Sequence, residues 1–148
     1  MEKNKKIVGI TCSTFDLLHA GHIIMLEECK KYCDYLICAL QVDPSTDRPE
    51  KNKPIQSLVE RYIQLDAVGY VDKIIPYNNE AELETIFASL DLDVRIIGEE
   101  YKDRKFTGKD ICQKRGIRLV YNKRDHDFST TNLRERIYIQ ESNKRFVK

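Results

Sequence analysis

Short apolar runs alternate with amphipathic segments along the whole chain, and this alternation limits the possible folds more than any other feature. The runs are rich in Val, Ile and Leu, as in strands that are buried on both faces of a sheet. They occupy five segments: Lys6–Cys12, Tyr35–Val42, Asp72–Tyr77, Asp93–Gly98 and Ile117–Tyr121. Strands that are separated by helices are joined through crossovers, so the pattern predicts a parallel sheet.

The segments between these runs carry apolar residues three or four positions apart, which is the spacing of one helix face. In one of them Ser57 precedes Glu60 by three residues, the pattern of a capping box. We therefore expect five helices, at His22–Tyr32, Ser57–Tyr70, Asn79–Leu90, Gly108–Gly116 and Ser129–Ile139. The polar segment Asp43–Pro54 contains three prolines and is expected to be a loop.

This order of elements predicts an α/β fold. We expect a single Rossmann-like, doubly wound domain over residues 1–148, with a five-stranded parallel sheet flanked by helices. In such folds ligands bind beyond the carboxyl ends of the strands. The unusual segments of this chain follow strand ends, so we expect its function to reside there.

Composition argues against several classes of function. The net charge is +1, so bulk charge gives no reason to expect a nucleic-acid partner. No apolar stretch is long enough to span a bilayer, so we expect no membrane partner. The five cysteines lack a paired spacing, which fits small apolar residues in a reducing cytoplasm.

Two of the three histidines, His19 and His22, lie three residues apart where the first strand leads into the first helix. On a helical turn both side chains share one face, and the free N–H groups at a helix start attract anions. Gly21 leaves the backbone bare for a flat ligand. Thr14 adds a hydroxyl, and Asp16 can brace the turn. The pattern favours a phosphate site, and the absence of GxGxxG argues against a dinucleotide cofactor.

Two other interpretations of the histidine pair stay open at this point. Histidines at this spacing also bind metals, here with Cys12 or His126 as a third ligand. The glutamate that serves as general base in zinc proteases is missing between them. The pair can equally be structural.

Four separated motifs together resemble one family. They are TFDLLHAGH (Thr14–His22), YVDKIIPY (Tyr70–Tyr77), IIGEEY (Ile96–Tyr101) and RDHDFSTT (Arg124–Thr131). The first resembles the HxGH motif of the small nucleotidylyltransferase superfamily, and the last resembles its RTEGISTT motif. Within this superfamily the chain is similar first to the glycerol-3-phosphate cytidylyltransferases and next to the nucleotidylyltransferase domain of ADP-heptose synthases.

The resemblance implies direct transfer of CMP from CTP to a small phosphate monoester, with release of pyrophosphate and no enzyme-bound intermediate. His19 and His22 would contact the triphosphate and stabilise charge on its α-phosphate. Arg124 would clamp the β- and γ-phosphates, and Mg²⁺ would neutralise them. The nucleotide-binding residues implied are Thr14, Phe15, Asp16, Gly21, Gly98, Glu99, Glu100, Tyr101, Ser129, Thr130 and Thr131.

The resemblance assigns the acceptor side less sharply. Lys51 or Lys53, in the Pro-rich loop, would hold the phosphates or the attacking substrate, and the choice between them stays open. Arg61 would reach inward from the following helix or form a surface salt bridge. Lys102 would supply a further cation. Members of this family form homodimers, and we carry that expectation over to this chain.

Two departures from the family pattern leave the substrates open. Gly69 stands where cytidylyltransferases carry a basic residue before YVD, and Ala20 stands where they carry an aromatic residue. The segment Thr46–Arg61 resembles the corresponding loop of the heptose enzymes. The alternatives are an adenylyltransferase acting on a sugar phosphate such as heptose 1-phosphate, and a non-catalytic nucleotide-binding module.

Overall fold

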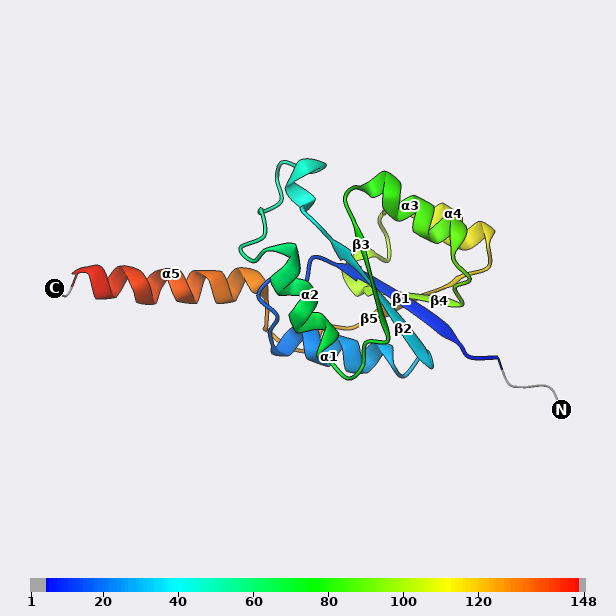
Figure 1. Ribbon diagram of the computed structural model, residues 1–148, viewed down its shortest axis with the longest axis horizontal. Helices are drawn as coiled ribbons and strands as arrows, with labels where there is room; N and C mark the ends of the chain where they lie inside the picture. Colours follow the sequence, from blue (N-terminus) through cyan, green and yellow to red (C-terminus); the bar gives the residue numbers. More distant parts are fainter. Residues whose placement is uncertain (1–4, 147–148) are drawn as a thin grey trace.

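The computed structural model describes residues 5–146 and contains the predicted five-stranded parallel sheet (Figure 1). Its strands are β1 (Val8–Ser13), β2 (Tyr35–Gln41), β3 (Lys73–Tyr77), β4 (Val94–Gly98) and β5 (Arg118–Asn122). They lie in the order β3-β2-β1-β4-β5, and all four pairings are parallel. The chain changes direction across the sheet at β1, which makes the carboxyl end of β1 the switch point at which ligands bind in folds of this kind.

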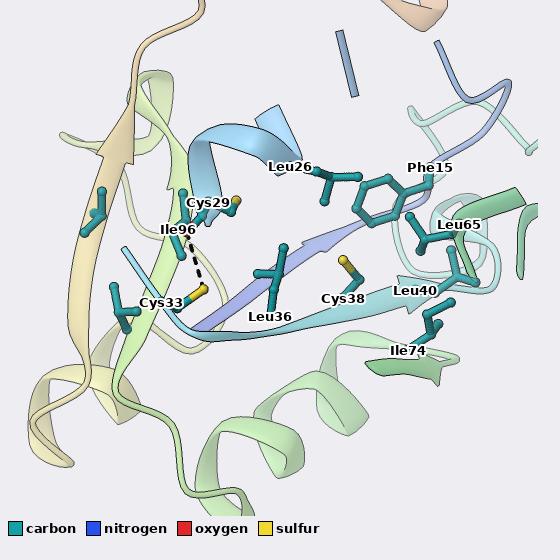
Figure 2. Close-up of a cluster of buried hydrophobic side chains, with 12 residues drawn as sticks. Phe15, Leu26, Cys29, Cys33, Leu36, Cys38, Leu40, Leu65, Ile74 and Ile96 are labelled. Carbon is teal, nitrogen blue, oxygen red and sulfur yellow. Dashed lines mark hydrogen bonds between the residues drawn. The ribbon is translucent and has the colours of Figure 1, made fainter. Parts of the chain in front are cut away.

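Helices cover both faces of the sheet (Figure 1). They are α1 (Ala20–Cys29), α2 (Leu58–Asp66), α3 (Glu80–Ser89), α4 (Lys109–Lys114) and α5 (Thr130–Phe146), with 3-10 turns η1 (Pro44–Thr46) and η2 (Glu99–Tyr101). On the face of α1 and α2, Leu26 and Leu65 join one apolar cluster with the sheet (Figure 2). On the other face, Leu83, Phe87 and Cys112 of α3 and α4 join a second cluster. The sheet is thus buried on both sides, as its apolar strands predicted.

The cysteines serve as small apolar residues, as the sequence predicted. All five are free thiols, and Cys29, Cys33 and Cys38 lie within the cluster under α1 and α2 (Figure 2). Burial raises the pKa of Cys29 to about 12. The Cys33 Sγ donates to the Cys29 carbonyl over 3.3 Å. These thiols therefore stay protonated and unreactive at neutral pH.

The predicted elements are confirmed in type, but several ends differ. Helix α1 begins at Ala20 instead of His22, because His19 serves as its N-cap. Strand β3 begins at Lys73 instead of Asp72 and includes Pro76, because β3 is an edge strand and a proline there removes no inward ladder bond. The Ser57–Glu60 capping box at the start of α2 is present as predicted.

Helix α5 projects away from the sheet and extends beyond the predicted Ile139 to Phe146 (Figure 1). Its start is fastened to the domain: the Thr130 hydroxyl donates to the Asp16 carbonyl over 3.2 Å. Further along, Ile137, Tyr138 and Ile139 are 50%, 73% and 56% exposed. Among the residues described, no helix combines the length and the apolar character that crossing a membrane requires.

Gly9, in the central strand, allows the turn between α1 and β2, which carries Cys33, to pack closely against the sheet. A Cβ at this position would lie 2.8 Å from the Cys33 Cβ, whereas one at Gly69 would meet nothing within 4 Å. We expect Gly9→Ala to lower the free energy of unfolding by about 1–3 kcal/mol, because backbone must shift. The matched Gly69→Ala should stay within about 0.5 kcal/mol of wild type. Urea unfolding measures the free energy of unfolding of both variants. Equal losses in the two variants would show that the close approach of Gly9 and Cys33 does not limit packing.

Candidate active site

A cavity of about 650 Å³ lies at the carboxyl ends of β1, β4 and β5, beside the start of α1. We call it the first cavity. It gathers seven of the predicted site residues from three separate segments of the chain: His19, Gly21, His22, Gly98, Glu100, Tyr101 and Arg124. The position is the one expected for a ligand site in a parallel sheet.

His19 and His22 form the start of α1 as well as one wall of the first cavity. The His19 Nδ1 accepts from the Gly21 N–H over 3.0 Å, and the His22 Nδ1 accepts from the His19 N–H over 3.1 Å. The two rings stack with centroids 3.9 Å apart. A ring nitrogen that accepts a hydrogen bond carries no proton, so each neutral imidazole holds its proton on Nε2. The helix cap thus fixes two Nε2–H donors side by side.

Both histidines are held in the uncharged form. Burial, followed by the charges of His19 and Arg124, lowers the pKa of His22 from 6.5 to about 3. Burial and the Arg124 charge also lower the pKa of His19. Protonation at Nδ1 would break the capping bonds as well. The pair therefore offers hydrogen-bond donors to an anion without the repulsion of two adjacent cations.

The third histidine closes the first cavity over the start of α1. A Cβ at Gly21 would lie 2.8 Å from the His126 Cε1 and 2.9 Å from the His19 Cε1, so only glycine fits between the two rings. The sequence had suggested His126 only as a metal ligand. In residues 5–146 no group of three or more His, Cys, Asp and Glu side chains is placed to hold a metal ion.

Three predicted residues of the β1–α1 loop, Thr14, Phe15 and Asp16, do not line the first cavity. Phe15, predicted to bind nucleotide, is 1% exposed and lies in the apolar core (Figure 2). Its ring centroid lies 5.5 Å from that of His22. The buried Asp16 carboxylate accepts from the N–H groups of Ile55 and Gln56. Thr14 faces a second cavity instead. The loop is strained, because Phe15 has a φ of 50°.

Arg61 has a different role from the substrate-binding one predicted. Its side chain is 2% exposed and lines neither cavity. Its guanidinium donates only to backbone carbonyls, those of Thr14, Gln41, Val42 and Gln56. Neither of the two predicted positions of the Arg61 side chain, towards the substrate or in a surface salt bridge, matches these contacts. Arg61 fixes the loops around the site.

The segment after β4 reaches the site only in part. Gly98, Glu100 and Tyr101 line the first cavity, and a Cβ at Gly98 would collide with the Glu100 carboxylate. Glu99 and Lys102, predicted to bind nucleotide and substrate, are exposed and line neither cavity. Residues three apart share one side of a 3-10 turn, so Glu99 and Lys102 lie together on the side of η2 away from the first cavity.

Arg124 lines the first cavity, but the hydroxyl residues that follow it do not. The Ser129 Oγ accepts from the Asn132 N–H over 3.0 Å and so caps α5. The Thr130 hydroxyl is bound to the Asp16 carbonyl, and Thr131 is exposed. Of the residues predicted to clamp the phosphates, Arg124 thus lines the first cavity, while Ser129, Thr130 and Thr131 do not.

A second cavity of about 460 Å³ opens on the other side of the β1 end, next to the start of α3. Lys51 lines it, whereas the alternative Lys53 lines neither cavity. The two cavities share five lining residues: Cys12, Ser13, Arg95, Ile97 and Tyr101. They therefore meet at the end of β1.

Arg95 is a site residue that the sequence analysis missed. It is 4% exposed and lines both cavities. Its guanidinium carbon lies 4.3 Å from the Phe87 ring centroid and 4.9 Å from that of Phe106, and it donates to the Thr107 carbonyl. The sequence feature that could have indicated it is an arginine inside an apolar strand. A buried charge is costly without partners, so such a residue is expected to have a specific role.

Comparisons with known proteins agree with this architecture. The profile of the family described as Cytidylyltransferase-like matches residues 10–136. The chain is 34% identical over 128 residues to a glycerol-3-phosphate cytidylyltransferase of Bacillus subtilis (strain 168), covering 86% of this chain and 95% of that enzyme. It is 35% identical over 126 residues to a bifunctional protein HldE of Paramagnetospirillum magneticum, covering 84% of this chain and 26% of that longer protein.

A solved structure supports the same assignment. The lipopolysaccharide core biosynthesis protein from Thermoplasma volcanium GSS1 superposes with a TM-score of 0.63 at 25% identity, covering 84% of this chain and 100% of that one. A parallel sheet with a histidine-lined cavity at its switch point, together with these relatives, defines a nucleotidyltransferase. The chain belongs to the Cytidylyltransferase-like family of these enzymes.

The lowered pKa of His22 has a consequence for stability. Below about pH 6.5 the unfolded chain binds a proton at His22 while the folded chain does not until about pH 3. The free energy of unfolding should therefore fall as the pH drops through this range, by up to about 1.4 kcal/mol per pH unit from this group. In His22→Asn the side-chain oxygen keeps the capping bond but cannot titrate. The wild type should therefore lose stability relative to His22→Asn as the pH falls from 7 to 4, and an unchanged difference in the free energy of unfolding would contradict this account.

Proposed function

We propose that the enzyme transfers CMP from CTP to a small phosphate monoester, with glycerol 3-phosphate as the best candidate. The observation that carries the proposal is the pair of neutral imidazoles at the start of α1, each with an Nε2–H free for the nucleotide. The relatives named glycerol-3-phosphate cytidylyltransferase, which match over nearly their whole length, support this choice of substrates.

The reaction needs alignment more than acid–base chemistry. A phosphate monoester carries close to two negative charges at neutral pH, so its oxygen is already a nucleophile. It attacks the α-phosphorus of CTP, the new O–P bond forms, and the bond to the leaving pyrophosphate breaks with its electron pair. His19 and His22 donate to the α-phosphate oxygens, and Arg124 offsets the charge of the triphosphate.

Mg²⁺ would enter with the nucleotide. Among residues 5–146 no carboxylate cage is present, and such a donor set suits an ion held mainly by phosphates and water. Glu100 and Asp125 line the first cavity and would hold its water ligands, whereas Asp16 is occupied by the backbone of the Pro-rich loop. The ion would neutralise the triphosphate and ease the departure of pyrophosphate.

A second candidate is adenylyl transfer to a sugar phosphate. The similarity to the HldE protein favours it, at an identity close to that of the cytidylyltransferase. Pyrophosphate release with each of the four nucleoside triphosphates, Mg²⁺ and a panel of phosphate monoesters separates the candidates. Release with CTP and glycerol 3-phosphate supports the proposal, and release only with ATP and heptose 1-phosphate replaces it. Nucleotide binding without release from any pair would indicate a non-catalytic module.

Two kinds of substitution separate the catalytic and structural roles of the histidines. Asparagine places an oxygen near the Nδ1 position and keeps the cap, whereas glutamine places an N–H near the Nε2 position. We expect His19→Asn and His22→Asn each to lower kcat by about 10²–10³-fold, since each loses a donor to the transition state. Their melting temperatures should stay near that of wild type.

The glutamine variants test the same idea in reverse. His22→Gln should be less stable than His22→Asn, because the His19 N–H loses its acceptor. It should retain more activity, because an N–H still faces the first cavity. Equal activity in the two variants would show that the Nε2–H does not act on the nucleotide.

The enzyme is further proposed to form a homodimer. Val59 and Ile63 of α2 are 66% and 64% exposed, and α5 carries three exposed apolar residues on its projecting part. Apolar side chains gathered on such elements favour burial against a second copy. We expect a dimer of the wild type in sedimentation and a shift towards monomer in Tyr138→Glu. Gln140→Glu adds the same charge two residues away and should remain dimeric, and a monomeric wild type at micromolar concentration would refute the proposal.

A further inference from the structure

The second cavity carries more positive than negative charge. Four cationic side chains line it, from the Pro-rich loop, strand β4 and the segment after η2: Arg48, Lys51, Arg95 and Lys105. Among the described residues that line it, Glu80 is the only one with a carboxylate side chain. This carboxylate is already engaged, because its Oε1 lies 3.4 Å from the Arg48 Nη2 and accepts from the Gln41 Nε2 over 3.3 Å. The surplus of positive charge is left for a ligand.

Arg48 is the cation of this group with an unmet hydrogen-bonding need. Its Nε is buried and has no partner in the described part of the chain. A buried donor without an acceptor is unfavourable, and such groups mark sites where a ligand completes the bonding. The Arg48–Glu80 pair is also longer than a strong charge-assisted hydrogen bond. The guanidinium is therefore able to exchange Glu80 for a better anion.

We infer that Arg48 is a specificity-determining residue, which binds the phosphate of the acceptor in the second cavity and releases Glu80 to accept hydrogen bonds from the acceptor's hydroxyl groups. The inference rests on the proposed function and names the class of its second substrate. That class is a phosphate monoester with a neutral, hydroxylated remainder.

The lining of the second cavity supports this class over others. A freed Glu80 carboxylate and the buried Gln41 amide are partners for hydroxyl groups, and Gln41 is 3% exposed. Phe106 adds an aromatic ring against which a carbon chain packs. A remainder that carries an ammonium group would face four cations, which makes amino-alcohol phosphates poor acceptors.

The place of the second cavity also suits the reaction. It meets the first cavity at Cys12 and Ser13, on the opposite side of the β1 end from His22 and Arg124. An acceptor phosphate held by Arg48 would approach the α-phosphate from the side away from the β- and γ-phosphates. This is the direction that in-line attack requires.

The test compares Arg48→Gln with wild type and with Arg104→Gln, a change at an exposed arginine that lines neither cavity. Steady-state kinetics give KM for glycerol 3-phosphate and for CTP separately. We expect Arg48→Gln to raise the KM for glycerol 3-phosphate by about 10- to 100-fold, the effect of losing a charged hydrogen bond. The KM for CTP should stay within twofold, and Arg104→Gln should match wild type in both values.

Binding of glycerol 3-phosphate to the enzyme, followed by calorimetry with a non-hydrolysable CTP analogue present, gives a readout that does not need turnover. Loss of this binding in Arg48→Gln with unchanged analogue binding supports the inference, even if no nucleotidyl transfer is found and the proposed function fails. A raised KM for CTP instead would assign Arg48 to the nucleotide and overturn the inference. So would unchanged acceptor binding in Arg48→Gln, absence of binding to wild type, or turnover of choline phosphate as fast as glycerol 3-phosphate.

Discussion

The site depends on the buried guanidinium of Arg61. It joins carbonyls from three segments that are far apart in the sequence: Thr14 after β1, Gln41 and Val42 at the end of β2, and Gln56 before α2. Asp16 completes the link, because its carboxylate holds the backbone of Ile55 and Gln56 while its carbonyl holds α5. Loops at the end of a parallel sheet have few backbone hydrogen bonds of their own. The Arg61 side chain on α2 supplies hydrogen bonds that fix their positions.

This frame explains how two histidines that line the first cavity stay uncharged. The strained turn at Phe15 brings His19 to the first position before α1, and the Phe15 ring then packs near His22. Each ring is fixed by a backbone N–H instead of by a neighbouring carboxylate. A carboxylate partner would raise the histidine pKa and favour a cation, whereas a backbone donor favours the neutral ring. The choice of partner therefore sets the electrostatics of the site.

The sequence predicted the fold well, because alternating apolar runs and capping patterns report on local structure and burial. It also predicted the residues that lie on one continuous turn, such as His19, Gly21 and His22. The roles predicted for individual side chains were wrong where the contacts of a side chain depend on segments far away in the sequence. Arg61 and Asp16 carry charges that suggest a ligand, yet their partners are carbonyls and N–H groups that no motif reveals. Arg48 and Glu80 meet only because the Pro-rich loop folds over the start of α3.

The two cavities meet at the end of β1, the central strand, and each also has lining residues of its own. The first cavity is lined from α1, β4 and β5, whereas the second cavity adds the Pro-rich loop, the end of β3 and the start of α3 and shares Arg95, Ile97 and Tyr101 with the first. Substitutions of residues that line only the second cavity leave the histidine cap intact. A scaffold arranged in this way can diversify in evolution by changing the residues that line the second cavity alone, with the histidine pair of the first cavity inherited unchanged.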